Sequence, residues 1–178
     1  DVPLIGMVSR LVEQKGFAEL CGPEYGSLPR MLEKLPVQFV ILGSGERWCE
    51  EELQKLSAAS PNLAAYVTFD NRMAHLIEAG SDFFLMPSRY EPCGLNQMYS
   101  LRYGTIPIVR RTGGLADTVI PYNSDTGEGT GFLFEQIDPQ SLFAAVENAV
   151  TVWKEHPQHI EQMRIRGMQL RFSCSGSC

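Results

Sequence analysis

The sequence predicts an α/β fold: a doubly wound, mainly parallel sheet of about six strands, Rossmann-like in kind. Short apolar runs alternate along the chain with segments in which apolar residues recur every three or four positions, which is typical of strands alternating with helices. The clearest unit, residues 83–114, reads as strand, polar loop, helix and strand. In such a crossover the loop lies at the carboxyl end of the first strand, where open α/β sheets bind ligands.

Six apolar runs are predicted to be strands. They are continuously apolar and do not alternate with polar residues, which is typical of parallel strands covered on both faces. The runs are residues 4–8, 37–42, 66–69, 83–86, 106–109 and 131–134.

Helices are predicted between these strands. Residues 15–35 form a helical region that is interrupted at 21–23, because Pro23 removes a hydrogen bond and clashes with the preceding turn. We therefore expect a kink or two shorter helices there. The other predicted helices are residues 50–59, 73–79, a segment opening at Gly94, 139–152 and 158–170.

Size and composition restrict the possible functions. A chain of 178 residues is large enough for one domain with a core and too small for two ordinary ones. No apolar run approaches the ~20 residues needed to span a bilayer. The net charge of −6 argues against nucleic acid as a partner, since phosphate binding requires a basic face. We expect one domain with neither a membrane nor a nucleic-acid partner.

Two cations bracket the start of the first predicted helix. Arg10 follows the first strand, and Lys15 stands at the helix start. The free N–H groups and the dipole of a helix N-terminus add to such charges, and a diphosphate fits the resulting anion site. Two ordinary surface cations flanking a turn explain the local sequence equally well, so both interpretations stay open.

The loop of residues 87–93 carries one carboxylate, Glu91, and Gly94 follows it at a second helix start. A carboxylate beside a phosphate site is repelled by the phosphates, so a functional Glu91 is expected to face hydroxyls, which suggests a sugar. Taken alone, Glu91 is better explained as a surface or capping residue and Gly94 as a turn residue.

Three motifs that follow one another along the chain favour a functional explanation of these residues over a structural one. They are VSRLVEQKG at residues 8–16, SRYEPCGL at 88–95 and RRTGGLADTV at 110–119. Together they closely resemble the bacterial glycogen synthase and plant starch synthase family, which are retaining glycosyltransferases of the two-domain GT-B type. The likeness extends from residue 3 to about residue 172 and is to the C-terminal, nucleotide-sugar-binding half of that family.

The resemblance implies roles for individual residues. Arg10 and Lys15 would hold the diphosphate of ADP-glucose and stabilise the leaving group, and Glu91 would bind glucose hydroxyls; these three are the implied catalytic residues. The other implied donor-binding residues are Gly94 and Leu95, through backbone amides; Thr112, Gly113 and Gly114, through backbone near the phosphates or sugar; Phe69, under the adenine; and Tyr99.

Alternatives remain for several of these residues. Phe69 is nearly as well explained by core packing, and Gly113–Gly114 by a tight turn. Tyr99 stands eight residues after Glu91, where related retaining families outside this one carry a second glutamate. The tyrosine fits the glycogen and starch synthase group and leaves ribose recognition unassigned.

The resemblance also implies what the whole protein does. It would transfer glucose from ADP-glucose to an α-1,4-glucan with retention, without a metal or other cofactor, in the bacterial cytoplasm or in the plastid stroma of a plant. Residues 1–172 would be the donor-binding domain, and residues 173–178 a flexible or altered tail. The N-terminal acceptor domain is absent from this sequence, so we expect nucleotide binding with little or no transfer.

The sequence leaves two other functions open. One is the donor domain of a related UDP-sugar-dependent glycosyltransferase. The other is a non-catalytic nucleotide-binding domain, including an NAD-type module, although Ser9 and Arg10 stand where the Gly-x-Gly-x-x-Gly turn of such a module would begin.

Overall fold

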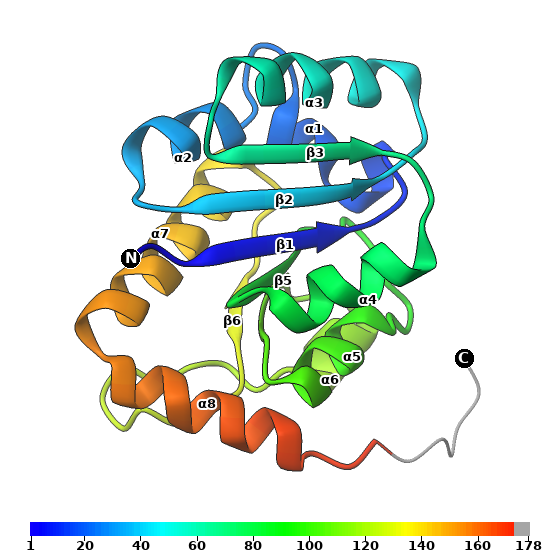
Figure 1. The fold of residues 1–178 in the computed structure, drawn as a ribbon. Helices are drawn as coiled ribbons and strands as arrows, with labels where there is room; N and C mark the ends of the chain where they lie inside the picture. The colour runs from blue at the N-terminus through cyan, green and yellow to red at the C-terminus, as the bar shows by residue number, and fades with distance from the viewer. Residues whose placement is uncertain (173–178) are drawn as a thin grey trace.

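A computed structural model describes residues 1–172 of the chain (Figure 1). They form one six-stranded, all-parallel sheet in the order β3-β2-β1-β4-β5-β6, which confirms the predicted fold class. The strands are β1 (Leu4–Val8), β2 (Gln38–Gly43), β3 (Leu63–Val67), β4 (Phe83–Met86), β5 (Ile106–Arg110) and β6 (Phe132–Phe134). The flexible or altered tail predicted at residues 173–178 lies outside the described residues.

Eight α-helices and one short 3-10 helix connect or follow these strands in the described part of the chain. They are η1 (Glu13–Lys15), α1 (Phe17–Cys21), α2 (Leu28–Lys34), α3 (Arg47–Ala59), α4 (Asn71–Gly80), α5 (Asn96–Tyr103), α6 (Gly113–Thr118), α7 (Pro139–Glu155) and α8 (Pro157–Gln169). None of them is long and apolar enough to cross a membrane.

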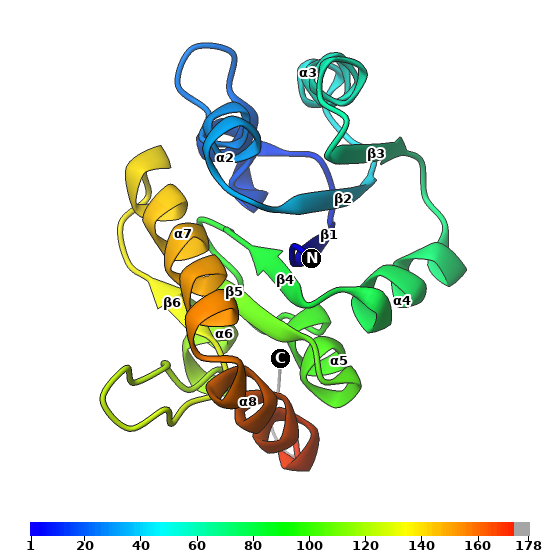
Figure 2. The same ribbon diagram turned by 60° about the vertical axis from the view of Figure 1, so that its left-hand side comes forward.

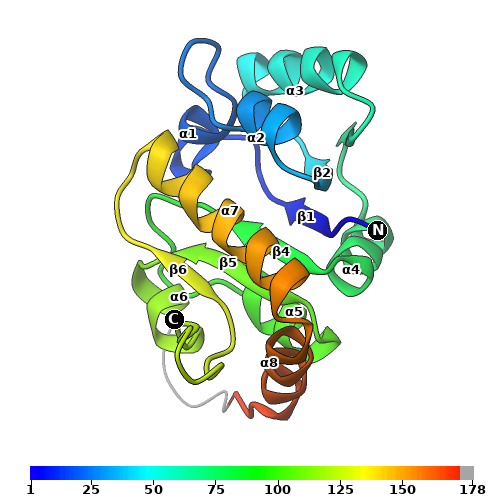
Figure 3. The same cartoon turned by 90° about the vertical axis from the view of Figure 1, so that its left-hand side faces the viewer.

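Helices cover both faces of the sheet, as its continuously apolar strands require. The larger core lies between the sheet and α1, α2, α3 and α7, and includes Phe17, Phe39 and Phe83. A smaller core lies on the other face, beneath α4 and α6, and includes Phe84 and Leu115. Figure 2 shows the two helical layers edge-on. Helix α7 runs across one face, and α8 continues from it to pack against α5 (Figure 3).

Local sequence explains where the principal helices begin and where one is broken. The side chains of Asp70 and Asp138 accept hydrogen bonds from backbone N–H groups at the starts of α4 and α7, at 2.9 Å and 2.7 Å. The predicted interruption at Pro23 is confirmed, since α1 ends at Cys21 and α2 begins only at Leu28.

The third strand differs from its prediction. The sequence predicts residues 66–69, but β3 spans Leu63–Val67 and pairs with β2 along its whole length. Ala64 and Ala65 are weak strand formers, which obscured the beginning of this strand. Phe69 consequently lies in the loop after β3, with 88% of its surface exposed. This overturns the alternative that Phe69 packs in the core.

The strand order creates a switch point beside β1. Successive strands are added outward from β1 to β3, and the chain then returns to place β4 on the other side of β1. The loops that leave β1 and β4 therefore diverge to opposite faces of the sheet, which opens a crevice at the carboxyl ends of these two strands.

The contrast between two phenylalanines tests this description of the core. Phe83 is fully buried at the start of β4 and contacts the ring of Phe132. Phe83→Ala should lower the free energy of unfolding by about 3–5 kcal/mol, because it leaves a cavity. Phe69→Ala removes an exposed ring of the same size and should change it by no more than about 0.5 kcal/mol. Urea unfolding measures both values, and equal losses would contradict the assigned positions.

Candidate functional site

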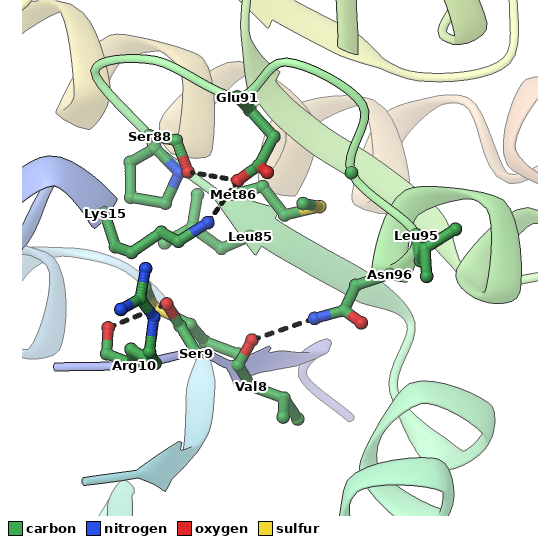
Figure 4. A pocket seen from close by; sticks show the side chains of 13 residues that line it. Val8, Ser9, Arg10, Lys15, Leu85, Met86, Ser88, Glu91, Leu95 and Asn96 are labelled. Atoms are coloured by element: carbon green, nitrogen blue, oxygen red, sulfur yellow. Dashed lines mark hydrogen bonds and ion pairs between the residues drawn. The ribbon is translucent and has the colours of Figure 1, made fainter. Parts of the chain in front are cut away.

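A cavity of about 340 Å³ lies at the switch point between the ends of β1 and β4. Ser9 and Arg10 line it from the end of β1, Lys15 from η1, Ser88 and Glu91 from the loop after β4, and Gly94, Leu95 and Asn96 from the start of α5. Figure 4 shows the Arg10, Lys15 and Glu91 side chains projecting into this one space. The structure thus brings together all three residues that the sequence predicts to be catalytic.

Lys15 and Glu91 form a direct ion pair inside this cavity. Both side chains are largely buried, and Glu91 also accepts a hydrogen bond from the Ser88 hydroxyl at 3.4 Å. The sequence predicts that Lys15 faces phosphate while Glu91 turns away towards a sugar. The structure instead joins the two groups. A buried carboxylate requires such partners, because leaving it uncompensated is costly.

A second ion pair holds the turn that carries Lys15 and the loop after β4 in fixed positions relative to each other. Arg89, in the loop after β4, donates to the Glu19 carboxylate of α1 at 2.7 Å and 3.0 Å, and its backbone N–H donates to the Gln14 carbonyl at 2.9 Å. The hydrogen bond to Glu19 is the main cause of the raised pKa of Arg89. These bonds fix the turn that carries Lys15 against the loop that carries Glu91.

Arg110 supports the same loop from β5. Its guanidinium donates to the backbone carbonyls of Ser88 and Glu135, at 2.9 Å and 3.1 Å, and also to that of Arg89. Because three carbonyls from two segments share one side chain, the loop is bound to the sheet rather than left free above it. Glu91 is therefore presented from a rigid support.

The start of α5 forms another wall of the cavity. Gly94 and Leu95 line it and immediately precede the helix, which begins at Asn96 rather than at Gly94. The first N–H groups of a helix have no acceptor within the helix and carry the positive end of its dipole. An anion in the cavity would face these groups and the two cations together.

Thr112, Gly113 and Gly114 lie differently from the other predicted site residues. They are not among the residues that line the cavity. The Gly114 N–H instead donates to the carbonyls of Glu91 and Pro92, at 3.0 Å and 3.1 Å. A Cβ on Gly113 would lie 2.1 Å from the Glu91 carbonyl oxygen, so the close approach requires glycine. Gly113 and Gly114 therefore pack against the backbone of the Glu91 loop.

A second cavity, of about 320 Å³, adjoins the first and shares Val8, Ser9, Arg10 and Asn96 with it. Its remaining wall comes from the end of β2, the loop after β3, and helices α4 and α5. Phe69 and Tyr99, both predicted donor-binding residues, line this second cavity and not the first. Within residues 1–172, no group of three or more His, Cys, Asp or Glu side chains could hold a metal ion.

Comparison with known proteins identifies the family of this chain. The family model described as "Glycosyl transferases group 1" matches residues 1–166. The chain belongs to the group 1 glycosyl transferases. It is 57% identical over 172 residues to a glycogen synthase of Treponema denticola, and 47% identical over 174 residues to one of Thermosipho africanus. In each case the match covers 97% of this chain and 35% of the relative, so the chain spans about a third of their length.

Solved structures extend the likeness of this glycosyl transferase domain. The catalytic domain of starch synthase IV from Arabidopsis thaliana, bound to ADP and acarbose, superposes with a TM-score of 0.86 at 35% identity and covers 97% of this chain and 35% of that one. Sucrose-phosphate synthase from Thermosynechococcus elongatus, at 21% identity and a TM-score of 0.72, covers 95% of this chain and 40% of that one and shares the fold. The predicted resemblance to glycogen and starch synthases is confirmed.

Several residues of this candidate site were not predicted. Arg89 and Glu19 are 70 positions apart, and no local pattern indicates that they meet. Asn96 joins both cavities and donates to the Val8 carbonyl at 3.1 Å, although it reads as an ordinary first residue of a helix. Ser88 stands three residues before Glu91 in the second motif, and this spacing could have identified it as a partner.

Gly16 provides a test of how the two walls meet. Its φ is +84°, and an added Cβ would lie 2.2 Å from the Pro87 carbonyl oxygen. Gly16→Ala should therefore lower the free energy of unfolding by about 1–3 kcal/mol or more, through both strain and displacement of the Lys15 turn. Thermal or urea unfolding measures this loss.

Gly80→Ala is the matched control, since a Cβ there meets nothing within 4 Å. It should change the free energy of unfolding by no more than about 0.5 kcal/mol. If the two variants unfolded alike, the close packing of the Lys15 turn on the β4 loop would be refuted.

Proposed function

We propose that this domain binds the donor of an ADP-glucose:α-1,4-glucan glucosyltransferase, a glycogen or starch synthase that elongates α-glucan with retention. The observation that carries the proposal is the convergence of Arg10, Lys15, Glu91 and the start of α5 on one cavity at the sheet's switch point. In the whole protein the acceptor, an α-1,4-glucan, binds to a part that this chain does not include.

Electrostatics define what the site contributes. The diphosphate lies against Arg10, Lys15 and the amides at Gly94 and Leu95, which stabilise the negative charge that develops on ADP as the glycosidic bond breaks. Arg10 can bind two phosphate oxygens at once, whereas Lys15 acts as a point charge. Phe69 offers an exposed ring face to the adenine, next to the second cavity.

The ion pair between Lys15 and Glu91 defines what Glu91 does when the donor binds. As the diphosphate takes Lys15 as its partner, the Glu91 carboxylate is released from it and accepts hydrogen bonds from glucose hydroxyls, still supported by Ser88. The Lys15 ammonium and the Glu91 carboxylate therefore each have a partner both before and after binding, because a buried charge without a partner is costly.

The choice of ADP over UDP is part of the proposal. It is supported by the starch synthase IV structure, which is bound to ADP, and by likeness to bacterial glycogen synthases. The bacterial glycogen synthases among the relatives favour a bacterial cytoplasm over a plastid as the compartment. A related UDP-sugar-dependent transferase and a non-catalytic nucleotide-binding domain are the alternatives that a binding experiment separates.

Calorimetric titration of this chain with ADP, ADP-glucose, UDP and NAD tests the proposal. ADP and ADP-glucose should bind, UDP should bind more weakly and NAD should not bind. Tighter binding of UDP would indicate the related transferase. Absence of binding by every nucleotide would refute the proposed function.

Removing either cation should weaken ADP binding. Arg10→Ala and Lys15→Ala each remove a charge-assisted contact to phosphate, so the dissociation constant should rise roughly 10- to 100-fold. Arg47→Ala and Lys55→Ala, which remove exposed cations of the same types on α3, should leave it unchanged. An unaltered ADP affinity in a folded Lys15→Ala variant would contradict the assigned role.

The proposed site uses no metal, because cations and helix ends offset the diphosphate. The ADP dissociation constant should therefore be the same in excess EDTA as in millimolar Mg²⁺, at constant ionic strength. Titrations in the two buffers check this. A loss of ADP affinity in EDTA would show that a metal ion bridges the domain and the diphosphate.

A further inference from the structure

The second cavity contains a buried carboxylate that the proposed function does not yet use. Glu78 of α4 lines this cavity, and its side chain is only 3% exposed. Burial raises the pKa of the Glu78 carboxyl, and the neighbouring His75 acts in the opposite direction. A carboxylate so placed is costly unless a partner compensates it.

That partner is His75, one helical turn earlier on α4. Its Nδ1 atom lies 3.0 Å from Glu78 Oε2. The His75 side chain is 44% exposed and also lines the second cavity, where its ring meets the edge of Tyr99 at a centroid distance of 5.8 Å. The imidazole therefore stands between a buried acceptor and the open space of the cavity.

This arrangement limits what the ring can offer a ligand. An ionised Glu78 only accepts hydrogen bonds, so it retains the Nδ1 proton and leaves Nε2 as the free nitrogen. Nε2 is an acceptor in neutral imidazole and a donor in imidazolium. A hydroxyl group both donates and accepts, so it satisfies Nε2 in either protonation state. The pair is suited to a ligand hydroxyl.

The two cavities determine where on the ligand that hydroxyl lies. The wall that they share contains Arg10, a residue of the proposed diphosphate site, and the second cavity also includes the exposed ring of Phe69. A nucleoside diphosphate that spans both places its ribose between them, beside α4 and α5. Apart from the His75–Glu78 pair, the charged groups that line this cavity are Arg10 and Asp70, and Asp70 is already engaged as the cap of α4.

We propose that His75, positioned by Glu78, hydrogen-bonds through Nε2 to a ribose hydroxyl of the donor nucleotide, an inference that rests on the proposed function. His75 is the contacting residue and Glu78 the positioning residue. The pair serves as a ribose-specificity element, contributed by α4 from outside the three sequence motifs.

Calorimetry with ADP and 2′,3′-dideoxy-ADP tests this directly. Wild-type protein should bind ADP about three- to tenfold more tightly than the dideoxy compound, the range of one net hydrogen bond. His75→Phe keeps a ring against Tyr99 and removes both nitrogens. In this variant ADP affinity should fall to that of the dideoxy compound, whose own affinity should not change.

Two further variants separate positioning from folding. Glu78→Gln retains an acceptor for the Nδ1 proton of His75 and should keep most of the preference for ADP over dideoxy-ADP. Glu78→Met removes the acceptor and should lose that preference. The double variant His75→Phe/Glu78→Met leaves no buried charge, so it remains informative where His75→Phe alone fails to fold. His156→Phe, at an exposed histidine between α7 and α8, is the control and should bind both compounds as wild type does.

The outcomes distinguish the two proposals. If wild-type protein does not bind ADP, the proposed function fails and this inference fails with it. If it binds ADP but His75→Phe keeps the full preference over dideoxy-ADP, only the role of His75 is overturned. Inosine 5′-diphosphate, which changes the base and keeps the ribose, supplies the last comparison. If His75→Phe changes the preference for ADP over inosine 5′-diphosphate but leaves the preference for ADP over dideoxy-ADP unchanged, His75 contacts the base. That result would also overturn the inference.

Discussion

The parallel pairing of β1 with β4 is the constraint on which the site depends. These strands are adjacent in the sheet, but 74 residues separate Val8 from Phe83 in the sequence, and their outgoing loops turn to opposite faces. The crevice between the loops follows from that divergence. The site also requires that the turn carrying Lys15 and the loop carrying Glu91 be held close together. The Arg89–Glu19 ion pair, the Gln14 carbonyl and the glycine at position 16 achieve this, and they bring Lys15 into contact with Glu91.

The backbone around Glu91 is supported from two directions. Arg110 binds carbonyls on one side of the loop, and the amide of Gly114 binds carbonyls on the other. These contacts explain why the third motif matters although its glycines do not line the cavity. Arg110, Gly113 and Gly114 act on the cavity through the loop that they hold. The resemblance implies that Thr112, Gly113 and Gly114 bring their backbone close to the donor, whereas in this structure they do not line the cavity and the two glycines pack against the Glu91 loop.

Much of the fold could be predicted from the sequence, because continuously apolar runs such as those of β1, β4 and β5 have few alternatives in a chain of this size. The start of β3 was missed because two alanines carry little strand signal, and the error displaced Phe69 from a strand end to an exposed loop. The convergence of Arg10, Lys15 and Glu91 was predicted, but the contact between Lys15 and Glu91 was not. No local pattern specifies which of several charged groups meet across 76 residues. The His75–Glu78 pair was missed for a different reason: at a spacing of three it reads as an ordinary surface pair on a helix, and only its burial distinguishes it.

The Lys15–Glu91 contact also bears on which ligand suits the proposed site best. A bare nucleoside diphosphate that takes Lys15 leaves Glu91 with Ser88 as its remaining hydrogen-bond partner, at 3.4 Å, and a mostly buried carboxylate is then undercompensated. A nucleotide sugar supplies hydroxyl donors in the same step. Part of the cost of opening the ion pair is therefore recovered only when a sugar is attached to the diphosphate. If the proposed function holds, the ion pair disfavours ADP relative to ADP-glucose, and it thereby couples recognition of the phosphates to recognition of the sugar within one cavity.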